Sequence, residues 1–205
     1  LAGEAKMGRS RSHYAESKAI AERTVLNARS DQLAVIAIRP HLVWGPGDTQ
    51  LVGRIVDRAA SGRLAVIGTG NALVDSTYID NAISGHIAAL DALHIGSACD
   101  GKAYVISNGE PRTVNELMRS MCESAGVPFE PRHLSLTLGI RLGSLVERLW
   151  PLMQSSEPPI TRFIAEQLGT AHWFDQRVVH NDLKWAPSVT LDQGFKRLTQ
   201  WFASH

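Results

Sequence analysis

The sequence has 205 residues and a formal net charge of +1, because 21 Lys and Arg residues stand against 20 Asp and Glu residues. This length predicts one domain or a domain and a half, and a hydrophobic content of 44% excludes a disordered chain. The balanced charge excludes the basic field of a nucleic-acid-binding protein. Cys99 and Cys122 lack metal-ligand spacing and are too few for a disulfide framework, which favours a reducing, cytoplasmic location.

The first half of the chain alternates between predicted helices and strands. Residues 14–29 contain no Gly or Pro and are rich in good helix formers, so they predict a helix. The continuous apolar run at 33–38 predicts a strand buried on both faces and ended by Arg39 and Pro40. Glycines and a proline predict a loop at 44–50.

The alternation continues beyond this loop. We predict a helix over 51–60, strands at 64–68 and 73–79, and a helix to about residue 93 that Asp80 caps. A further strand is expected at 102–107. Thr113 then begins a T-x-x-E capping box, which opens a helix to about residue 125.

This order predicts an α/β fold with at least part of the sheet parallel. Two strands followed by long helices are too few for a complete doubly wound sheet, so we expect further strands before residue 1.

The segment 134–153 has an unusual composition and leaves two interpretations open. As a helix it separates into a polar stripe and a leucine stripe, and its three charged residues argue against a membrane span. It is then a helix packed on its own domain, or a lid over an apolar pocket or lipid-contacting surface. The leucine stripe consists of Leu138, Leu142, Leu145, Leu149 and Leu152.

Tyr14 and Lys18 stand four residues apart, so a helix places both on one face, one turn apart. A tyrosine is normally too weak an acid to act at neutral pH, since its free pKa is about 10. A nearby ammonium group stabilises the phenolate and lowers that pKa. The pair can therefore exchange a proton with a carbonyl or alcohol oxygen during redox chemistry, although the same spacing also occurs as an ordinary surface pair.

The histidines and tryptophans indicate no second site. His86 and His94 lie eight residues apart, and no HxxxH or HxH pair appears anywhere, so we expect no metal. The three residues Trp173, Trp185 and Trp201 are expected to be core or domain-closing aromatics.

Five segments in order resemble the second half of an extended short-chain dehydrogenase/reductase, in the branch of the 3β-hydroxysteroid dehydrogenase/isomerases. The resemblance covers nearly all of the chain and is weakest at 126–175. The segments are HYAESKAIAE (13–22), LAVIAIRPHLVWGPGD (33–48), STYIDNAISGHIAAL (76–90), GKAYVISNGEPRTVNEL (101–117) and LKWAPSVTLDQGFKRLTQWF (183–202).

The resemblance implies roles for particular residues. Tyr14 would be the catalytic acid/base, and Lys18 would lower its pKa and bind the nicotinamide ribose. The segment from Pro40 to Val43 would line the nicotinamide, with backbone groups near Val43 meeting the carboxamide. His41 and the GPGD turn would shape the neighbouring loop and the substrate entrance.

The glycine-rich phosphate-binding turn of such enzymes is not in this sequence, because its closely spaced glycine pairs follow the catalytic helix. We therefore expect residues 1–125 to supply the catalytic helix and the last strands of the nucleotide-binding sheet, interleaved with substrate-lobe segments. Residues 126–205 would form mainly the substrate lobe and C-terminal helices, with the dinucleotide-binding half preceding residue 1. We expect the chain by itself to be inactive.

The resemblance implies an NAD- or NADP-dependent oxidoreductase for a sterol-like or long-chain β-hydroxy or β-keto substrate. The alternatives are a nucleotide-sugar epimerase or dehydratase of the same superfamily and a non-catalytic dinucleotide-binding protein. The expected partner is a small apolar substrate rather than nucleic acid, with peripheral membrane contact and a homodimer as further options.

Overall fold

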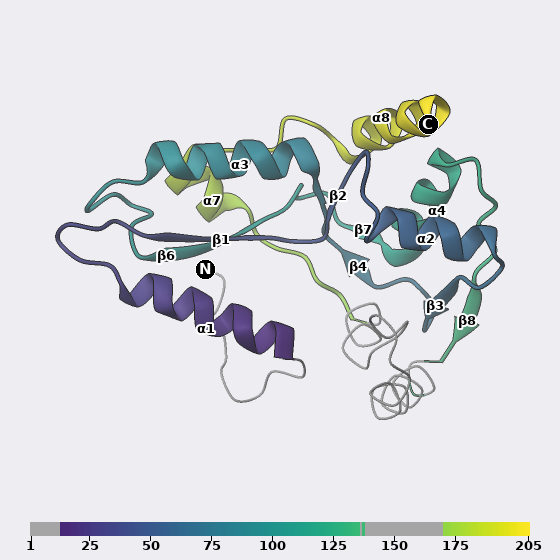
Figure 1. The fold of residues 1–205 in the computed structure, drawn as a ribbon, viewed down its shortest axis with the longest axis horizontal. Helices are drawn as coiled ribbons and strands as arrows, with labels where there is room; N and C mark the ends of the chain where they lie inside the picture. Colours follow the sequence, from purple (N-terminus) through teal and green to yellow (C-terminus); the bar gives the residue numbers. More distant parts are fainter. Residues whose placement is uncertain (1–12, 136, 138–169) are drawn as a thin grey trace. The chain divides into compact units, whose positions relative to one another are not determined.

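The computed structural model describes residues 13–135, 137 and 170–205 (Figure 1). The chain divides into two compact units, and each is assembled from separate stretches of sequence. Unit 1 comprises Leu1–Val43, Asp75–Glu110 and Phe174–Leu191, whereas unit 2 comprises Trp44–Val74, Pro111–Trp173 and Asp192–His205.

Unit 1 is built on a parallel pair of strands. Strand β1 (Ile36–Pro40) pairs with β6 (Lys102–Ile106), in a register that runs from Ile36 opposite Lys102 to Pro40 opposite Ile106. Helices α1 (His13–Asn27) and α3 (Ile79–Ala92) both contact β1, and α7 (Arg177–Leu183) contacts β6. Figure 1 draws α1 and α3 on opposite sides of this strand pair, which is the layered arrangement expected of an α/β fold.

The core of unit 1 lies between β6, α3 and α7. Gly85 allows this packing, because a Cβ atom there would stand 2.6 Å from the Cδ1 atom of Ile106. A larger residue would push α3 away from the strand. The buried cluster consists of Ala89, Cys99, Tyr104, Ile106, Val179, Leu183 and Trp185.

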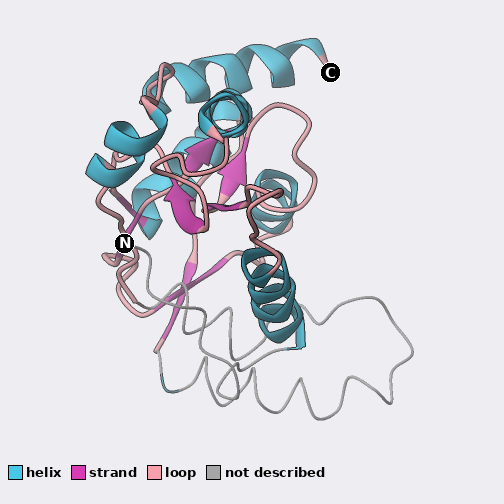
Figure 2. Ribbon diagram, turned by 90° about the vertical axis from the view of Figure 1, so that its left-hand side faces the viewer, coloured by secondary structure: helices cyan, strands magenta, loops and turns pink. Residues whose placement is uncertain are grey.

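Unit 2 contains shorter strand pairs and the remaining helices. Strands β3 (Ala65–Ile67) and β8 (Arg132–Leu134) are parallel, whereas β4 (Leu73–Val74) and β7 (Arg112–Thr113) are antiparallel. The helices described in this unit are α2 (Val52–Ala60), α4 (Val114–Ser124) and α8, which begins at Leu191 and ends at Ser204. Figure 2 shows the strands of the described residues in magenta and the helices in cyan.

Two aromatic rings form part of the core of unit 2. Trp44 is 1% exposed and stacks on Phe195, with ring centroids 4.4 Å apart. Strand β2 (Val43–Trp44) brings the chain to this point and pairs with β5 (Thr77–Tyr78).

Several predictions of local structure are confirmed. Helix α1 occupies the predicted 14–29 region, and α2 the predicted 51–60 region. The capping box is present as expected: the Glu116 N–H donates to the Thr113 hydroxyl at 3.1 Å, and the Thr113 N–H donates to the Glu116 carboxylate at 2.8 Å.

Three predictions need correction. The strand expected at 33–38 is β1, which includes Arg39 and Pro40 and is half-buried throughout, because its one paired neighbour in the described structure is β6. The strand expected at 73–79 is divided into β4 and β5, since Asp75 is buried and hydrogen-bonded between them. Asp80 lies in the first turn of α3, and Tyr78 occupies the N-cap.

The aromatic and cysteine predictions have mixed outcomes. Trp185 is 6% exposed, as expected of a core residue, whereas Trp173 is 61% exposed and the core prediction for it is wrong. Cys99 and Cys122 are both free and buried. The leucine stripe predicted within 134–153 lies outside the described residues. No helix in the described ranges is long and apolar enough to span a bilayer.

Candidate active site

The two predicted acid/base residues lie in α1. Tyr14 is the second residue of this helix, and Lys18 follows one helical turn later with an exposed side chain. The helix therefore gives the Tyr14–Lys18 pair the backbone spacing that the sequence predicts.

The predicted nicotinamide-binding segment lies where β1 ends. Pro40 is the last residue of β1, and the His41 N–H donates to the Ile106 carbonyl oxygen at 3.0 Å, which keeps the chain beside β6 for one more residue. Ligands of open α/β sheets bind beyond the carboxyl ends of parallel strands. A proline ring followed by turning backbone at such an end fits the flat face and polar amide of a nicotinamide.

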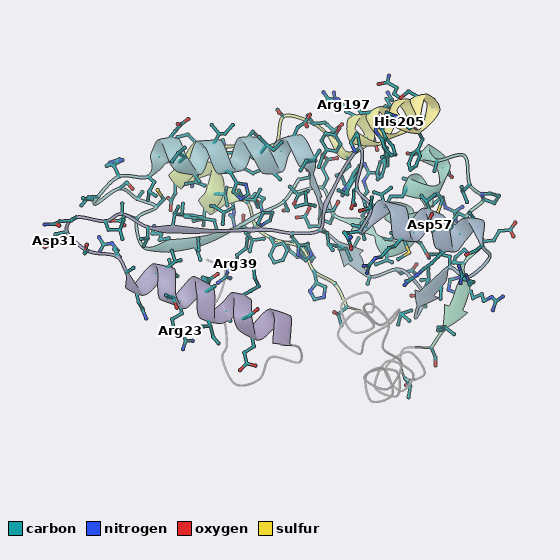
Figure 3. All side chains as sticks on the ribbon, in the orientation of Figure 1. Arg23, Asp31, Arg39, Asp57, Arg197 and His205 are labelled. Atoms are coloured by element: carbon teal, nitrogen blue, oxygen red, sulfur yellow. The ribbon has the colours of Figure 1, made fainter. Side chains whose placement is uncertain are left out.

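An ion pair joins the two elements that carry these residues. In Figure 3 Arg39 reaches from β1 toward α1, and its guanidinium forms a bidentate pair with the Glu22 carboxylate through Nε and one terminal nitrogen. The hydrogen bond from Arg39 to Glu22 raises the pKa of Arg39 against the effect of burial. The pair connects the helix of Tyr14 and Lys18 to the strand that leads into Pro40.

A left-handed residue lies inside the predicted cofactor segment. Leu42 has φ +43° and is 37% exposed. A positive φ is unfavourable for a branched, bulky residue and persists only where surrounding contacts enforce it. Here the Thr77 N–H donates to the Leu42 carbonyl oxygen at 3.2 Å, and the Thr77 hydroxyl donates to the His41 carbonyl oxygen at 2.7 Å.

A buried carboxyl group lies in the same unit. Asp75 is completely buried, and its Oδ2 atom accepts a hydrogen bond from the Ser107 hydroxyl at 2.6 Å. Burial raises the pKa of Asp75, although the Ser107 hydroxyl and nearby backbone groups of residues 109, 110 and 174 lower it in part. The position differs from a solvated active-site carboxylate, because the whole side chain is shielded from water.

The GPGD turn has a structural role in unit 2. The Asp48 carboxylate accepts hydrogen bonds from the N–H groups of Gln50, Leu51 and Val52, at 2.8, 3.1 and 3.0 Å. Val52 is the first residue of α2, whereas Gln50 and Leu51 belong to the turn that precedes the helix. Asp48 therefore holds the turn that leads into α2 and binds one N–H group of its first turn, which has no partner within the helix.

The described residues contain no group of three or more His, Cys, Asp or Glu side chains arranged to hold a metal ion. His86 and His94 instead contact nearby backbone carbonyl oxygens through Nδ1, at 2.7 and 3.1 Å.

Sequence reasoning missed three residues of this region. Glu22 pairs with Arg39, just before the predicted segment, across 17 positions of the chain, and Thr77 bonds His41 within that segment across 36 positions, so no local pattern indicates either contact. Asp75 left a weak signal, since a carboxyl group inside an otherwise strand-like stretch interrupts apolar alternation.

Curated relatives match nearly the whole chain. It is 48% identical over 186 residues to the 2-alkyl-3-oxoalkanoate reductase of Stenotrophomonas maltophilia, which covers 90% of this chain and 56% of that protein. It is 32% identical over 197 residues to the decarboxylating sterol-4-alpha-carboxylate 3-dehydrogenase of Mus musculus, which covers 93% of this chain and 52% of that protein. The chain thus spans about half the length of these relatives.

Solved structures share the fold. A structure described as gox2253 matches 94% of this chain and 56% of its own, with a TM-score of 0.67 and 24% identity. The WbmF enzyme of Bordetella bronchiseptica in complex with NADH matches 97% of this chain and 55% of its own, with a TM-score of 0.64 and 17% identity. At these identities the likeness shows the fold alone, which is a Rossmann-like α/β fold.

The family profile described as the 3-beta hydroxysteroid dehydrogenase/isomerase family matches residues 4–138. This range includes α1 and β1, and therefore Tyr14, Lys18 and the Pro40–Val43 segment. The chain belongs to the 3-beta hydroxysteroid dehydrogenase/isomerase family.

Proposed function

We propose that the whole protein is an NAD(P)-dependent oxidoreductase that interconverts a ketone and a secondary alcohol on a long-chain β-keto or sterol-like substrate. The identity of 48% with a 2-alkyl-3-oxoalkanoate reductase carries this proposal and favours the β-keto acid class. The same class has a small polar head beside long apolar chains, which agrees with the small apolar partner expected from the sequence.

Within that protein, this chain supplies the C-terminal part. Among the residues that the structure describes, β1 and β6 form a two-stranded parallel sheet, whereas a dinucleotide-binding sheet has about six strands. The glycine-rich phosphate-binding turn is not in the sequence. The chain then contributes the catalytic helix, the last strands of the nucleotide-binding sheet and the smaller substrate lobe.

The chemistry follows from two side chains of α1. Bound nicotinamide supplies the hydride for reduction and accepts it for oxidation. Tyr14 donates its phenolic proton to the carbonyl oxygen of the ketone as that oxygen becomes an alkoxide, and it takes the proton back when the alcohol is oxidised. Lys18, one turn away, stabilises the phenolate that remains on Tyr14.

Binding is assigned to the end of β1. Pro40 would lie against the nicotinamide ring, backbone groups near Val43 would bind its carboxamide, and Lys18 would also bind the ribose hydroxyls. The carboxyl-end position of Pro40 and the ion pair between Arg39 and Glu22 support this assignment, since together they associate α1 with the strand end.

The test uses the whole protein and follows the oxidation of reduced nicotinamide with 2-alkyl-3-oxoalkanoates of increasing chain length. Tyr14→Phe is expected to lower kcat by about 10²–10⁴-fold with little change in the Kd of the cofactor, because the hydroxyl acts on the substrate. Tyr104→Phe is the matched control, since the Tyr104 hydroxyl bonds Asp182 at 2.6 Å instead. Wild-type turnover in Tyr14→Phe, with chemistry rate-limiting, would contradict the assignment.

A further inference from the structure

We propose that Thr77 is a positioning residue for the cofactor: it holds Leu42 in its left-handed conformation and so fixes the backbone between Pro40 and Val43. The inference rests on the proposed function, because that function assigns the Pro40–Val43 segment to the nicotinamide.

Leu42 needs an external constraint. Only glycine, and less often Asn or Asp, adopts a positive φ without much cost, and a leucine at φ +43° is an outlier. Its side chain is 37% exposed, so burial in a core does not offset that cost. Backbone outliers of this kind gather at ligand sites, where a fixed geometry is useful.

Thr77 constrains the backbone at Leu42 through two of its own groups, its backbone N–H and its side-chain hydroxyl. Its backbone N–H donates to the Leu42 carbonyl oxygen at 3.2 Å, and its hydroxyl donates to the carbonyl oxygen of the preceding residue, His41, at 2.7 Å. Two consecutive carbonyl groups are thereby held by one residue, which fixes the orientation of the two peptide groups on either side of Leu42.

The same hydroxyl also lies close to the end of strand β6. It lies 3.0 Å from the Ile106 carbonyl oxygen, which accepts the His41 N–H at 3.0 Å as well. Ile106 is the last residue of β6 and is 0% exposed. The turn at Leu42 is therefore set against the carboxyl end of the neighbouring parallel strand, where the cofactor is expected.

The residue type supports a specific use of the hydroxyl. Thr77 is 0% exposed in strand β5. A valine has the same shape and fits a buried strand better, because a buried hydroxyl costs free energy unless it is hydrogen-bonded. At this position threonine differs from valine by the hydroxyl that donates a hydrogen bond to the His41 carbonyl oxygen.

The first experiment measures the Kd of reduced nicotinamide for the whole protein by fluorescence titration. Thr77→Val should weaken binding about fivefold to tenfold, the affinity equivalent of one net hydrogen bond, and Thr77→Ser should restore most of it. Ser124→Ala is the matched control: its buried hydroxyl donates to the Ser120 carbonyl oxygen at 2.8 Å in unit 2, so its loss should reduce stability and leave Kd unchanged.

The second experiment tests the link to Leu42. Because glycine adopts a positive φ freely, Thr77→Val should change Kd by less than about twofold in a Leu42→Gly background. Leu42→Val should weaken cofactor binding by itself, since a β-branched residue resists this φ still more. Leu42→Val alters an exposed side chain and is expected to fold. It therefore tests the proposal even if Thr77→Val does not fold.

The possible results separate the two proposals. An unchanged Kd in Thr77→Val and Leu42→Val, or the same penalty in both Leu42 backgrounds, would overturn the role of Thr77 alone. A wild-type protein that binds neither NADH nor NADPH would overturn the proposed function and this inference together. Cofactor binding without reduction of β-keto acids would overturn the proposed substrate and leave the Thr77 test intact.

Discussion

Arg39 of β1 and Glu22 of α1 are joined by a bidentate ion pair, with side chains that are 28% and 14% exposed. The pair lies two helical turns beyond Tyr14 on the helix and one residue before Pro40 on the strand. It therefore fixes how α1, the helix of Tyr14 and Lys18, packs against β1, the strand that leads into the Pro40–Val43 segment.

We expect Glu22→Gln to lower the free energy of unfolding by about 1–3 kcal/mol, because it removes a partly buried, charge-assisted pair of hydrogen bonds. Denaturant titration measures this loss. Asp175→Asn is the control: it breaks the pair with Arg177, whose side chain is 86% exposed, and it should change stability little. Equal losses in both variants would show that the Arg39–Glu22 pair does not fix α1.

Lys18 is expected to set the pH at which Tyr14 acts as a base. In alcohol oxidation by the whole protein, Lys18→Met should move the rising limb of the kcat profile to higher pH, because the ammonium no longer stabilises the phenolate. Lys184→Met, on the segment after α7, is a control for loss of one lysine charge. A profile unchanged from wild type would remove Lys18 from the acid/base pair.

We expect the contribution of Asp75 to the free energy of unfolding to fall as pH rises. Burial raises the pKa of this carboxyl in the folded state above its ordinary value of 3.8, which applies to the unfolded chain. At a pH between the unfolded-state pKa and the folded-state pKa, the folded protein therefore binds more protons than the unfolded one. The free energy of unfolding contributed by Asp75 is then present at the acidic end of this window and is lost as pH rises through the folded pKa.

The measurement compares wild type with Asp75→Asn by denaturant unfolding at several pH values from about 4 to 8, where carboxyl groups titrate. The variant lacks the titrating group, so the difference between the two proteins should change across this window. A pH-independent difference would contradict a raised pKa at Asp75. Other carboxyl groups cancel in the comparison, including Asp182, whose pKa the Tyr104 and Lys102 side chains lower.

Asn81 is expected to be one of the most sensitive positions in unit 1. Its Nδ2 group donates to the Asn108 side-chain oxygen at 2.9 Å and to the Val189 carbonyl oxygen at 2.7 Å, and its Oδ1 atom accepts the N–H groups of Ser188 and Val189. Asn81→Asp replaces the two donors by a carboxylate in a fully buried site.

This substitution should cost about 3 kcal/mol or more at neutral pH, because it buries a charge against two oxygen acceptors. Thermal or denaturant unfolding measures the loss. Asn71→Asp provides the same chemical change on an exposed residue of unit 2 and should alter stability by less than about 0.5 kcal/mol. Comparable effects of the two substitutions would mean that the Asn81 hydrogen bonds contribute little.

Local features of this fold could be predicted from the sequence, whereas its long-range contacts could not. Thr113 and Glu116 stand three residues apart, and their capping box forms as the pattern predicts because both partners are local. The helix of Tyr14 and Lys18 is likewise encoded in its own residues.

The conformation of Leu42 illustrates the opposite case. The leucine side chain does not predict φ +43°, because the residues that enforce this conformation are Thr77 of β5 and Ile106 of β6. The tertiary hydrogen bonds of Thr77 override local preference there. The same reason explains why the pairing of Arg39 with Glu22, and the burial of Asp75, become visible only in the folded chain.

The interleaving of the two units constrains the order in which this chain folds during synthesis. The chain passes between units after residues 43, 74, 110, 173 and 191. Unit 1 needs Trp185 for its core and Val189 for the Asn81 hydrogen bonds, and both lie near the end of the sequence. Neither unit is therefore complete before residue 189 has been synthesised, so a nascent chain that ends earlier exposes apolar surface of both units, and exposed apolar surface of this kind favours aggregation.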